Sequence, residues 1–84
     1  MFFVYILECK DMTFYVGSTT DLLKRLYAHN NLKSGAHYTK IRRPVALKYS
    51  EKFRTYAKAR AREAELKRLN RQGKIELING KSKL

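Results

Sequence analysis

The alternation of apolar and polar positions divides the chain into short strands and amphipathic helices. Residues 2–9 and 13–18 are rich in aromatic and β-branched side chains, which favours strands, and residues 10–12 between them predict a turn. A third strand is expected at residues 45–50. The first two strands therefore form a predicted N-terminal hairpin.

Helical spacing follows in three other segments. Apolar residues recur every three to four positions over 22–30, after the capping residues 18–21. A long helix is expected over 55–69 and a short one over 71–78, whereas the polar and basic residues 31–44 are interpreted as a loop with at most a turn of helix. The order β-β-α-β-α-α predicts an α+β fold in which helices cover a three-stranded sheet.

The length of the hairpin turn decides which face of the sheet each tyrosine occupies. A three-residue turn pairs Tyr5 with Gly17, which makes Tyr5 and Tyr15 diagonal neighbours on one face. A two-residue turn places the two tyrosines on opposite faces. We favour the three-residue turn. Gly17 also indicates a bulge or a close approach by backbone or ligand.

A carboxylate lies on the apolar face of the long helix. Glu63 shares the stripe that begins at Tyr56 and continues through Ala59 and Leu66, so it is expected to face the sheet. There it needs a cation, either an arginine or a metal ion. Glu65 lies on a different stripe and is interpreted as a surface partner of nearby arginines.

The first helix also turns polar groups toward the sheet. Arg25 and His29 are one turn apart and face the same way. Each group has an ordinary structural explanation: Tyr5 and Tyr15 as core aromatics, Arg25 paired with Glu63, and His29 as a partner of the helix dipole. Their expected convergence on one sheet face nevertheless indicates a polar site.

The charge of the chain points to a polyanionic partner. The 84 residues include 19 Lys and Arg against 7 Asp and Glu, a net charge of +12, which favours nucleic acid. Six basic side chains are singled out as phosphate contacts: Lys24, Lys40, Arg42, Arg43, Arg60 and Lys67.

Other classes are excluded by composition. The single cysteine, Cys9, rules out an intramolecular disulfide framework and a multi-cysteine zinc site. The longest apolar run, Met1–Leu7, is shorter than the ~20 residues of a membrane span and lacks the flanks of a signal peptide. We therefore expect a cytoplasmic protein without membrane contacts.

Several motifs, taken together, resemble a known family. Val4-Tyr5-Ile6 and Tyr15-Val16-Gly17 resemble the paired signature of the GIY-YIG endonuclease superfamily, and residues 21–30 (DLLKRLYAHN) match its first-helix motif. Residues 35–49, which include Gly35-Ala36-x-Tyr38-Thr39, resemble its small stand-alone bacterial branch, related to the nuclease domains of structure-specific endonucleases. Glu63 falls at the position of the family's metal-binding glutamate.

The resemblance, over about residues 2–78, implies a three-stranded antiparallel sheet and metal-dependent hydrolysis of DNA, with a structure-selective role in repair or recombination. By position, Tyr15 would be the general base or water-orienting group, with Tyr5 beside it. Arg25 would hold the scissile phosphate, Glu63 would bind one Mg²⁺ or Mn²⁺ ion, and His29 would assist proton transfer or position a tyrosine. A free tyrosine has a pKa of ~10, so the metal ion and Arg25 would have to favour its phenolate.

The chain departs from the family pattern in places. Met12 replaces a glycine common in the hairpin turn, and either Asn70 or Asn79 is a candidate for the family's supporting asparagine. We expect one domain over 1–79, a frayed basic tail over 80–84, and a monomer whose specificity rests on this domain or on a protein partner. The alternatives are a non-catalytic nucleic-acid-binding module with the same fold and a protein-interaction module.

Overall fold

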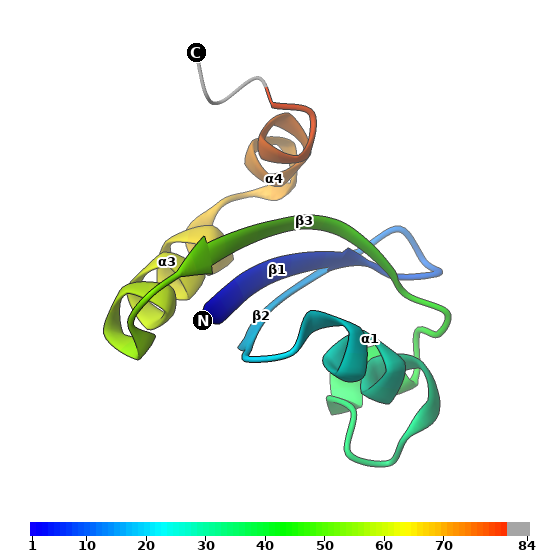
Figure 1. Ribbon diagram of the computed structural model, residues 1–84. Coiled ribbons are helices and arrows are strands. Elements are labelled where there is room, and N and C mark those ends of the chain that lie inside the picture. Colours follow the sequence, from blue (N-terminus) through cyan, green and yellow to red (C-terminus); the bar gives the residue numbers. More distant parts are fainter. Residues whose placement is uncertain (81–84) are drawn as a thin grey trace.

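The computed structural model of the protein describes residues 1–80, and its centre is a three-stranded antiparallel sheet (Figure 1). The strands are β1 (Phe2–Glu8), β2 (Phe14–Thr19) and β3 (Ala46–Phe53), in the order β2-β1-β3. The hydrophobic run at the start of the chain thus becomes the central strand, with its residues 4–7 buried. Strand β2 lies at an edge of the sheet.

Within residues 1–80, four helices accompany the sheet: the three predicted ones in the predicted order and one helical turn before β3. They are α1 (Leu22–Asn31), α2 (His37–Lys40), α3 (Tyr56–Arg68) and α4 (Arg71–Ile78). The side chains of Asp21, Thr55 and Asn70 accept hydrogen bonds from the first turns of α1, α3 and α4, and so satisfy backbone N–H groups that have no partner inside the helix. Helix α2 is the single helical turn expected within the loop over 31–44. Residues 81–84 of the expected tail lie outside the described residues.

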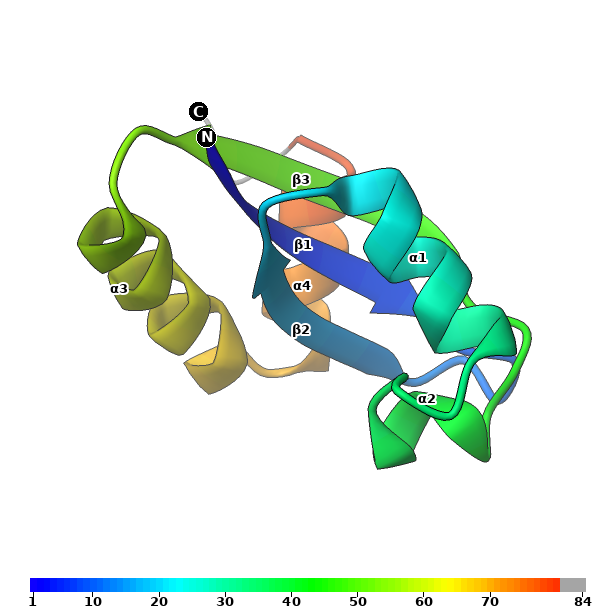
Figure 2. The ribbon, with the colours of Figure 1, turned by 60° about the horizontal axis from the view of Figure 1, so that its bottom comes forward.

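The helices cover both faces of the sheet (Figures 1 and 2). Helices α3 and α4 pack on the face of β1 that carries Val4 and Ile6, together with Leu66 and Leu77. The opposite face carries Tyr5 and Leu7 and packs against α1 and the segment around α2. Successive residues of β1 therefore belong to two separate hydrophobic clusters.

The hairpin register confirms the three-residue turn. Tyr5 pairs with Gly17 and Leu7 with Tyr15, and the Cys9 amide donates to the Thr13 carbonyl oxygen at 2.8 Å. Tyr5 and Tyr15 consequently lie on the same face. The side-chain alternation of a strand leaves no other arrangement at this register.

Two predictions about element ends and burial were wrong. Strand β3 continues to Phe53, because its pairing with β1 runs on to Phe2 through the polar residues Glu51 and Lys52. Tyr56, expected on the buried stripe of α3, is 57% exposed, and its ring lies 5.7 Å from that of Phe2 at the start of the central strand β1.

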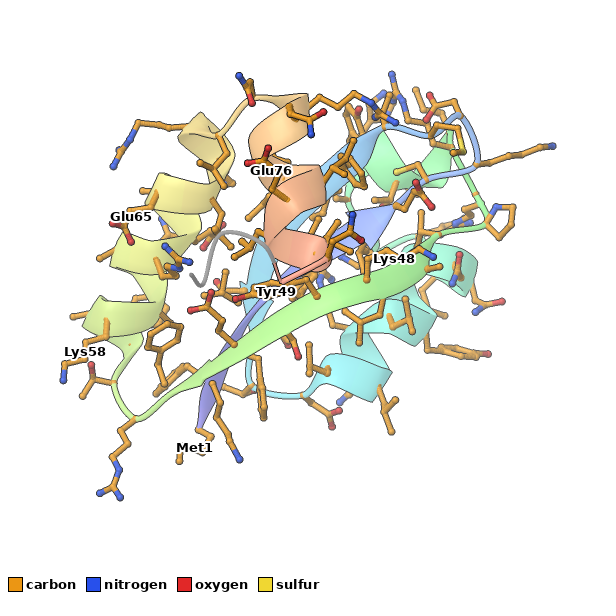
Figure 3. The ribbon with its side chains drawn as sticks, turned by 90° about the horizontal axis from the view of Figure 1, so that it is seen from above. Met1, Lys48, Tyr49, Lys58, Glu65 and Glu76 are labelled. Atoms are coloured by element: carbon orange, nitrogen blue, oxygen red, sulfur yellow. The ribbon has the colours of Figure 1, made fainter. Side chains whose placement is uncertain are left out.

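The surface prediction for Glu65 is confirmed. Figure 3 shows Glu65 on the outer side of α3, and its carboxylate lies 3.5 Å from the Arg62 guanidinium. Arg62 makes closer contacts with Glu51 of β3, at 3.0 Å between Nη2 and Oε2. The pair from α3 to β3 fixes the helix across the sheet.

The hairpin turn provides a first testable prediction. Met12 has a φ of 70°, in the left-handed region that favours glycine. We expect Met12→Gly to raise the free energy of unfolding by about 0.5–1 kcal/mol, measured by chemical denaturation. Met12→Ala, which keeps the strained backbone, is the control. An equal gain in both variants would assign the effect to the exposed Met12 side chain instead.

Candidate functional site

The site centres on the Tyr5 hydroxyl, which lies over the backbone of edge strand β2. A Cβ atom on Gly17 would be 2.5 Å from the Tyr5 oxygen and 3.1 Å from Cε2 of Tyr15. Such distances are far inside van der Waals contact, so only glycine fits between the two phenol rings. The close approach expected at Gly17 is therefore that of a side chain of the protein itself.

A chain of buried hydrogen bonds leads from Tyr5 into the protein. The Tyr5 hydroxyl lies 2.8 Å from Nε2 of His29, and Nδ1 of His29 lies 2.7 Å from Oγ1 of Thr39. The Thr39 hydroxyl donates to the Ala36 carbonyl oxygen at 2.9 Å. His29 thus lies between Tyr5 and Thr39, its predicted role in proton transfer or in positioning a tyrosine stays a prediction, and Thr39 is buried.

Burial and the neighbouring charges set the protonation states of this pair. Burial raises the pKa of Tyr5 to about 12; the Arg25 guanidinium opposes this rise, whereas Tyr15 and Glu63 add to it. Burial lowers the pKa of His29 to about 4, and the positive charges of Arg25 and Arg43 lower it further. At neutral pH, Tyr5 is accordingly a neutral phenol and His29 a neutral imidazole.

Arg25 and Tyr15 lie beside this pair. The Arg25 guanidinium donates through Nη1 to the Ser34 carbonyl oxygen at 3.1 Å. The Tyr15 ring packs 5.1 Å from His29 and 6.1 Å from Tyr38, centre to centre. Within residues 1–80, the Tyr15 hydroxyl has no hydrogen-bond partner. The half-buried Tyr15 therefore offers a polar group to an incoming molecule.

Glu63 reaches the site from the other side of the sheet, which corrects the expectation that all the groups share one face. Helix α3 packs on the Val4 face, and Figure 2 shows α3 and α1 on either side of β2. The Glu63 carboxylate accepts a hydrogen bond from the Ser18 hydroxyl of β2 at 2.8 Å. A helical stripe shows that a residue faces the sheet but does not tell which face.

Cations surround the Glu63 carboxylate, but Arg25 is not among them. Lys67 Nζ lies 3.0 Å from one oxygen and Arg60 Nη1 lies 3.6 Å from the other. Burial favours the neutral acid, but the hydrogen bonds from Lys67 and Ser18 and the charges of Lys67 and Arg60 outweigh it and lower the pKa of Glu63. The side chain, 9% exposed, is therefore an anion at neutral pH.

This arrangement fits one divalent cation held by a single carboxylate. Within residues 1–80 there is no cluster of three His, Cys, Asp or Glu side chains that could enclose a metal. Mg²⁺ is commonly bound by one or two carboxylates together with water and substrate phosphate. Lys67 and Arg60 are more than half exposed, so both can move away from the carboxylate.

The basic residues expected at nucleic acid have different surroundings. Arg43 donates to the carbonyl oxygens of Ala28, His29 and Leu32 and so completes the end of α1, rather than presenting its guanidinium to solvent. Arg42 pairs with Asp11 at 2.9 Å and lies over the Tyr38 ring.

The other four basic residues make fewer contacts with the rest of the protein. The Lys40 ammonium donates to the Lys33 carbonyl oxygen, and Arg60 and Lys67 lie on either side of Glu63. Lys24 is exposed beside Arg25. These four keep their charged groups near the surface, and their contact with nucleic acid stays a prediction.

Some supporting residues were not foreseen. Ser18 was interpreted as a helix-capping residue, and nothing in the sequence placed Thr39 beside His29. Asn30 bonds both the amide and the carbonyl of Val45, at 2.7 and 3.1 Å, and ties α1 to the start of β3. Asn70, a candidate supporting asparagine, caps α4, while the Asn79 backbone N–H caps its end.

The fold, a three-stranded antiparallel sheet with helices on both faces, is the one expected for the GIY-YIG superfamily. Residues 1–76 match the sequence pattern of the GIY-YIG catalytic domain, so the chain belongs to this family. GIY-YIG domains form a nuclease superfamily. None of the helices within residues 1–80 is long and apolar enough to cross a membrane.

Individual relatives are small bacterial proteins of the UPF0213 group. One from Staphylococcus saprophyticus is 49% identical over 77 residues, covering 92% of this chain and 93% of the relative. One from Clostridium perfringens is 49% identical over 82 residues, covering 98% and 87%. The solution NMR structure of a UPF0213 protein from Bacillus halodurans has a TM-score of 0.61 at 40% identity, covering 96% of this chain and 86% of that one.

Proposed function

We propose that the protein is a divalent-metal-dependent endonuclease that hydrolyses phosphodiester bonds in DNA, with a preference for branched or flapped structures. The observation that carries the proposal is the convergence of four groups on the Tyr5 hydroxyl. His29 Nε2 lies 2.8 Å from the Tyr5 hydroxyl and the Tyr15 ring lies 6.5 Å from that of Tyr5, while the charges of Arg25 and Glu63 act on the pKa of Tyr5. A nuclease site needs groups of these kinds: a proton acceptor, a phosphate-binding cation and a metal-binding carboxylate.

Arg25 is suited to hold the scissile phosphate. A guanidinium has five N–H donors in a planar fork, and one of those of Arg25 is bonded to the Ser34 carbonyl oxygen. That bond orients the fork and leaves other donors for two phosphate oxygens. Lys24, Lys40, Arg60 and Lys67 add contacts to the phosphate backbone that do not depend on base sequence.

Tyr15 is suited to bind the attacking water and take its proton, because its hydroxyl is without a partner among residues 1–80. The raised pKa of Tyr5 opposes its ionisation, which makes Tyr5 a supporting phenol rather than the base. Glu63 would hold the divalent ion, which when bound supplies positive charge to the phosphate in the transition state. Lys67 and Arg60, released from Glu63, would then be free to contact the DNA.

The proposal is tested with a panel of flapped, branched, single-stranded and duplex DNA in Mg²⁺, Mn²⁺ or EDTA. We expect cleavage to require a metal ion, to fall about 100-fold in Tyr15→Phe and about 10–100-fold in Glu63→Gln. The amide oxygen introduced by Glu63→Gln can still accept from the Ser18 hydroxyl, so the fold is preserved. Tyr27→Phe and Glu65→Gln, which make the same chemical changes at exposed positions of α1 and α3, are matched controls.

The outcomes separate the alternatives. Salt-sensitive DNA binding without cleavage in any metal would favour the non-catalytic nucleic-acid-binding module. Cleavage at wild-type rate in both Tyr15→Phe and Glu63→Gln would contradict the assigned roles. Absence of any nucleic-acid binding at low salt would favour a protein-interaction module.

A further inference from the structure

The segment Ser34–Thr39 contains the motif Gly35-Ala36-x-Tyr38-Thr39, to which the proposed chemistry assigns no role. Its backbone lies directly on α1: a Cβ atom on Gly35 would be 2.6 Å from the Ala28 carbonyl oxygen and 3.0 Å from Cα of His29. Only glycine allows this approach. The segment is thereby held next to two polar side chains of α1, Arg25 and His29.

Both side chains bond to this segment. The Ser34 carbonyl oxygen accepts from Arg25 at 3.1 Å, and the Thr39 hydroxyl lies 2.7 Å from Nδ1 of His29. Thr39 is fully buried, as is His29. One short segment therefore contacts both Arg25, the proposed phosphate ligand, and His29, which bonds Tyr5.

The direction of the hydrogen bonds follows from the number of protons available. A threonine hydroxyl has one proton, and that of Thr39 is donated to the Ala36 carbonyl oxygen at 2.9 Å. The Thr39 oxygen must then accept a hydrogen bond from His29, so Nδ1 of His29 carries the ring proton. In a neutral imidazole Nε2 is then an acceptor, and the Tyr5 hydroxyl donates to it at 2.8 Å.

We propose that Thr39 is a positioning residue that fixes the Nδ1–H tautomer of His29, and that this tautomer directs the Tyr5 proton away from Arg25. The inference rests on the proposed function for its effect on cleavage. With its proton on the His29 side, Tyr5 presents only lone pairs to the Arg25 guanidinium, which is close enough to lower the pKa of Tyr5. In the opposite tautomer Nε2–H would donate to Tyr5, whose own proton would then point toward Arg25 and disturb its orientation.

The tautomer is measured directly by ¹⁵N NMR of the histidine ring nitrogens. The chain has two histidines, and His37→Gln assigns the signals. We expect wild-type His29 to carry its proton on Nδ1 at neutral pH. Thr39→Ser keeps the hydroxyl and should keep this tautomer, whereas Thr39→Val has the same shape without the acceptor and should shift His29 toward the Nε2–H form.

Cleavage kinetics connect the tautomer to the site. We expect Thr39→Val to lower kcat about tenfold, since small errors in the position of a catalytic group are costly. KM should change little, because several basic side chains share the binding of the phosphate backbone. Thr39→Ser should retain wild-type kcat. Thermal unfolding of both variants verifies that each is folded at the assay temperature.

Each result has a defined meaning. A wild-type His29 protonated on Nε2, or an unchanged tautomer in Thr39→Val, overturns the inference. A changed tautomer with unchanged kcat overturns the link to Arg25. If the wild-type protein cleaves no DNA, the proposed function fails, and the NMR measurement alone still decides whether Thr39 sets the tautomer.

Discussion

Gly17→Ala is expected to lower the free energy of unfolding by about 1–3 kcal/mol and to reduce DNA cleavage to the level seen without protein. The new methyl group would lie 2.5 Å from the Tyr5 oxygen and 2.8 Å from Cζ of the same ring. Tyr5 is 2% exposed in the centre of the sheet, so its ring has no free space to enter. The Tyr5 hydroxyl would be forced away from His29, and the arrangement around it would be lost.

Two further variants isolate the cause of the Gly17→Ala effect. Gly73→Ala in α4, where the nearest atom to the new Cβ is 3.3 Å away, should leave cleavage unchanged. Adding Tyr5→Phe to Gly17→Ala removes the closest clash and should recover part of the stability, measured by denaturant unfolding, without restoring cleavage. A Gly17→Ala protein with wild-type stability and cleavage would show that the Tyr5 hydroxyl does not occupy this place in solution.

Acid is expected to destabilise the protein through His29 before the carboxylates protonate. The pKa of His29 is lowered from 6.5 to about 4 in the folded protein. Between these values the unfolded chain binds a proton at this position and the folded protein does not. Above pH 6.5, His29 therefore causes no change in the free energy of unfolding with pH. As the pH decreases from 6.5 toward 4, His29 lowers this free energy by up to about 3 kcal/mol.

The comparison of His29→Gln with His37→Gln measures this contribution. The free energy of unfolding of each is determined from pH 7.5 to 4. His37 is exposed, so His37→Gln should keep the wild-type slope, whereas His29→Gln should have a flatter curve even if it is less stable at pH 7. The lowered pKa of Glu63 affects stability at the acid end of this range, from about pH 5 downward, and equally in both variants. Parallel curves would mean that His29 is not buried as a neutral ring.

The sequence predicted correctly those features whose pattern is compatible with a single geometry. A three-residue turn determines the hairpin register, so it placed Tyr5 and Tyr15 together. Helical spacing placed Glu63, Ala59 and Leu66 on one buried stripe, and all three are buried.

Other features depend on contacts between segments far apart in the chain. Arg43 has the charge of a phosphate ligand, but the unpaired carbonyl oxygens at the end of α1 bind its guanidinium. Thr39 lies in a polar stretch without periodicity, and only the packing of Gly35 on α1 brings it to His29. The face from which Glu63 arrives depends on how α3 crosses the sheet, which spacing within the helix does not encode.

Arg25 and Glu63 come from helices on opposite faces of the sheet, and both lie near the end of β2, where Glu63 bonds Ser18 and Arg25 lines a pocket with Thr19. The distance between the proposed phosphate ligand and the proposed metal ligand is thus set by how α1 and α3 pack on the sheet. Insertions in the connection that follows α3 would leave this spacing unaltered, whereas the segment that follows α1 is bonded to Arg25 and His29. Such an arrangement would let loops remote from these two residues vary while the proposed cleavage geometry is kept.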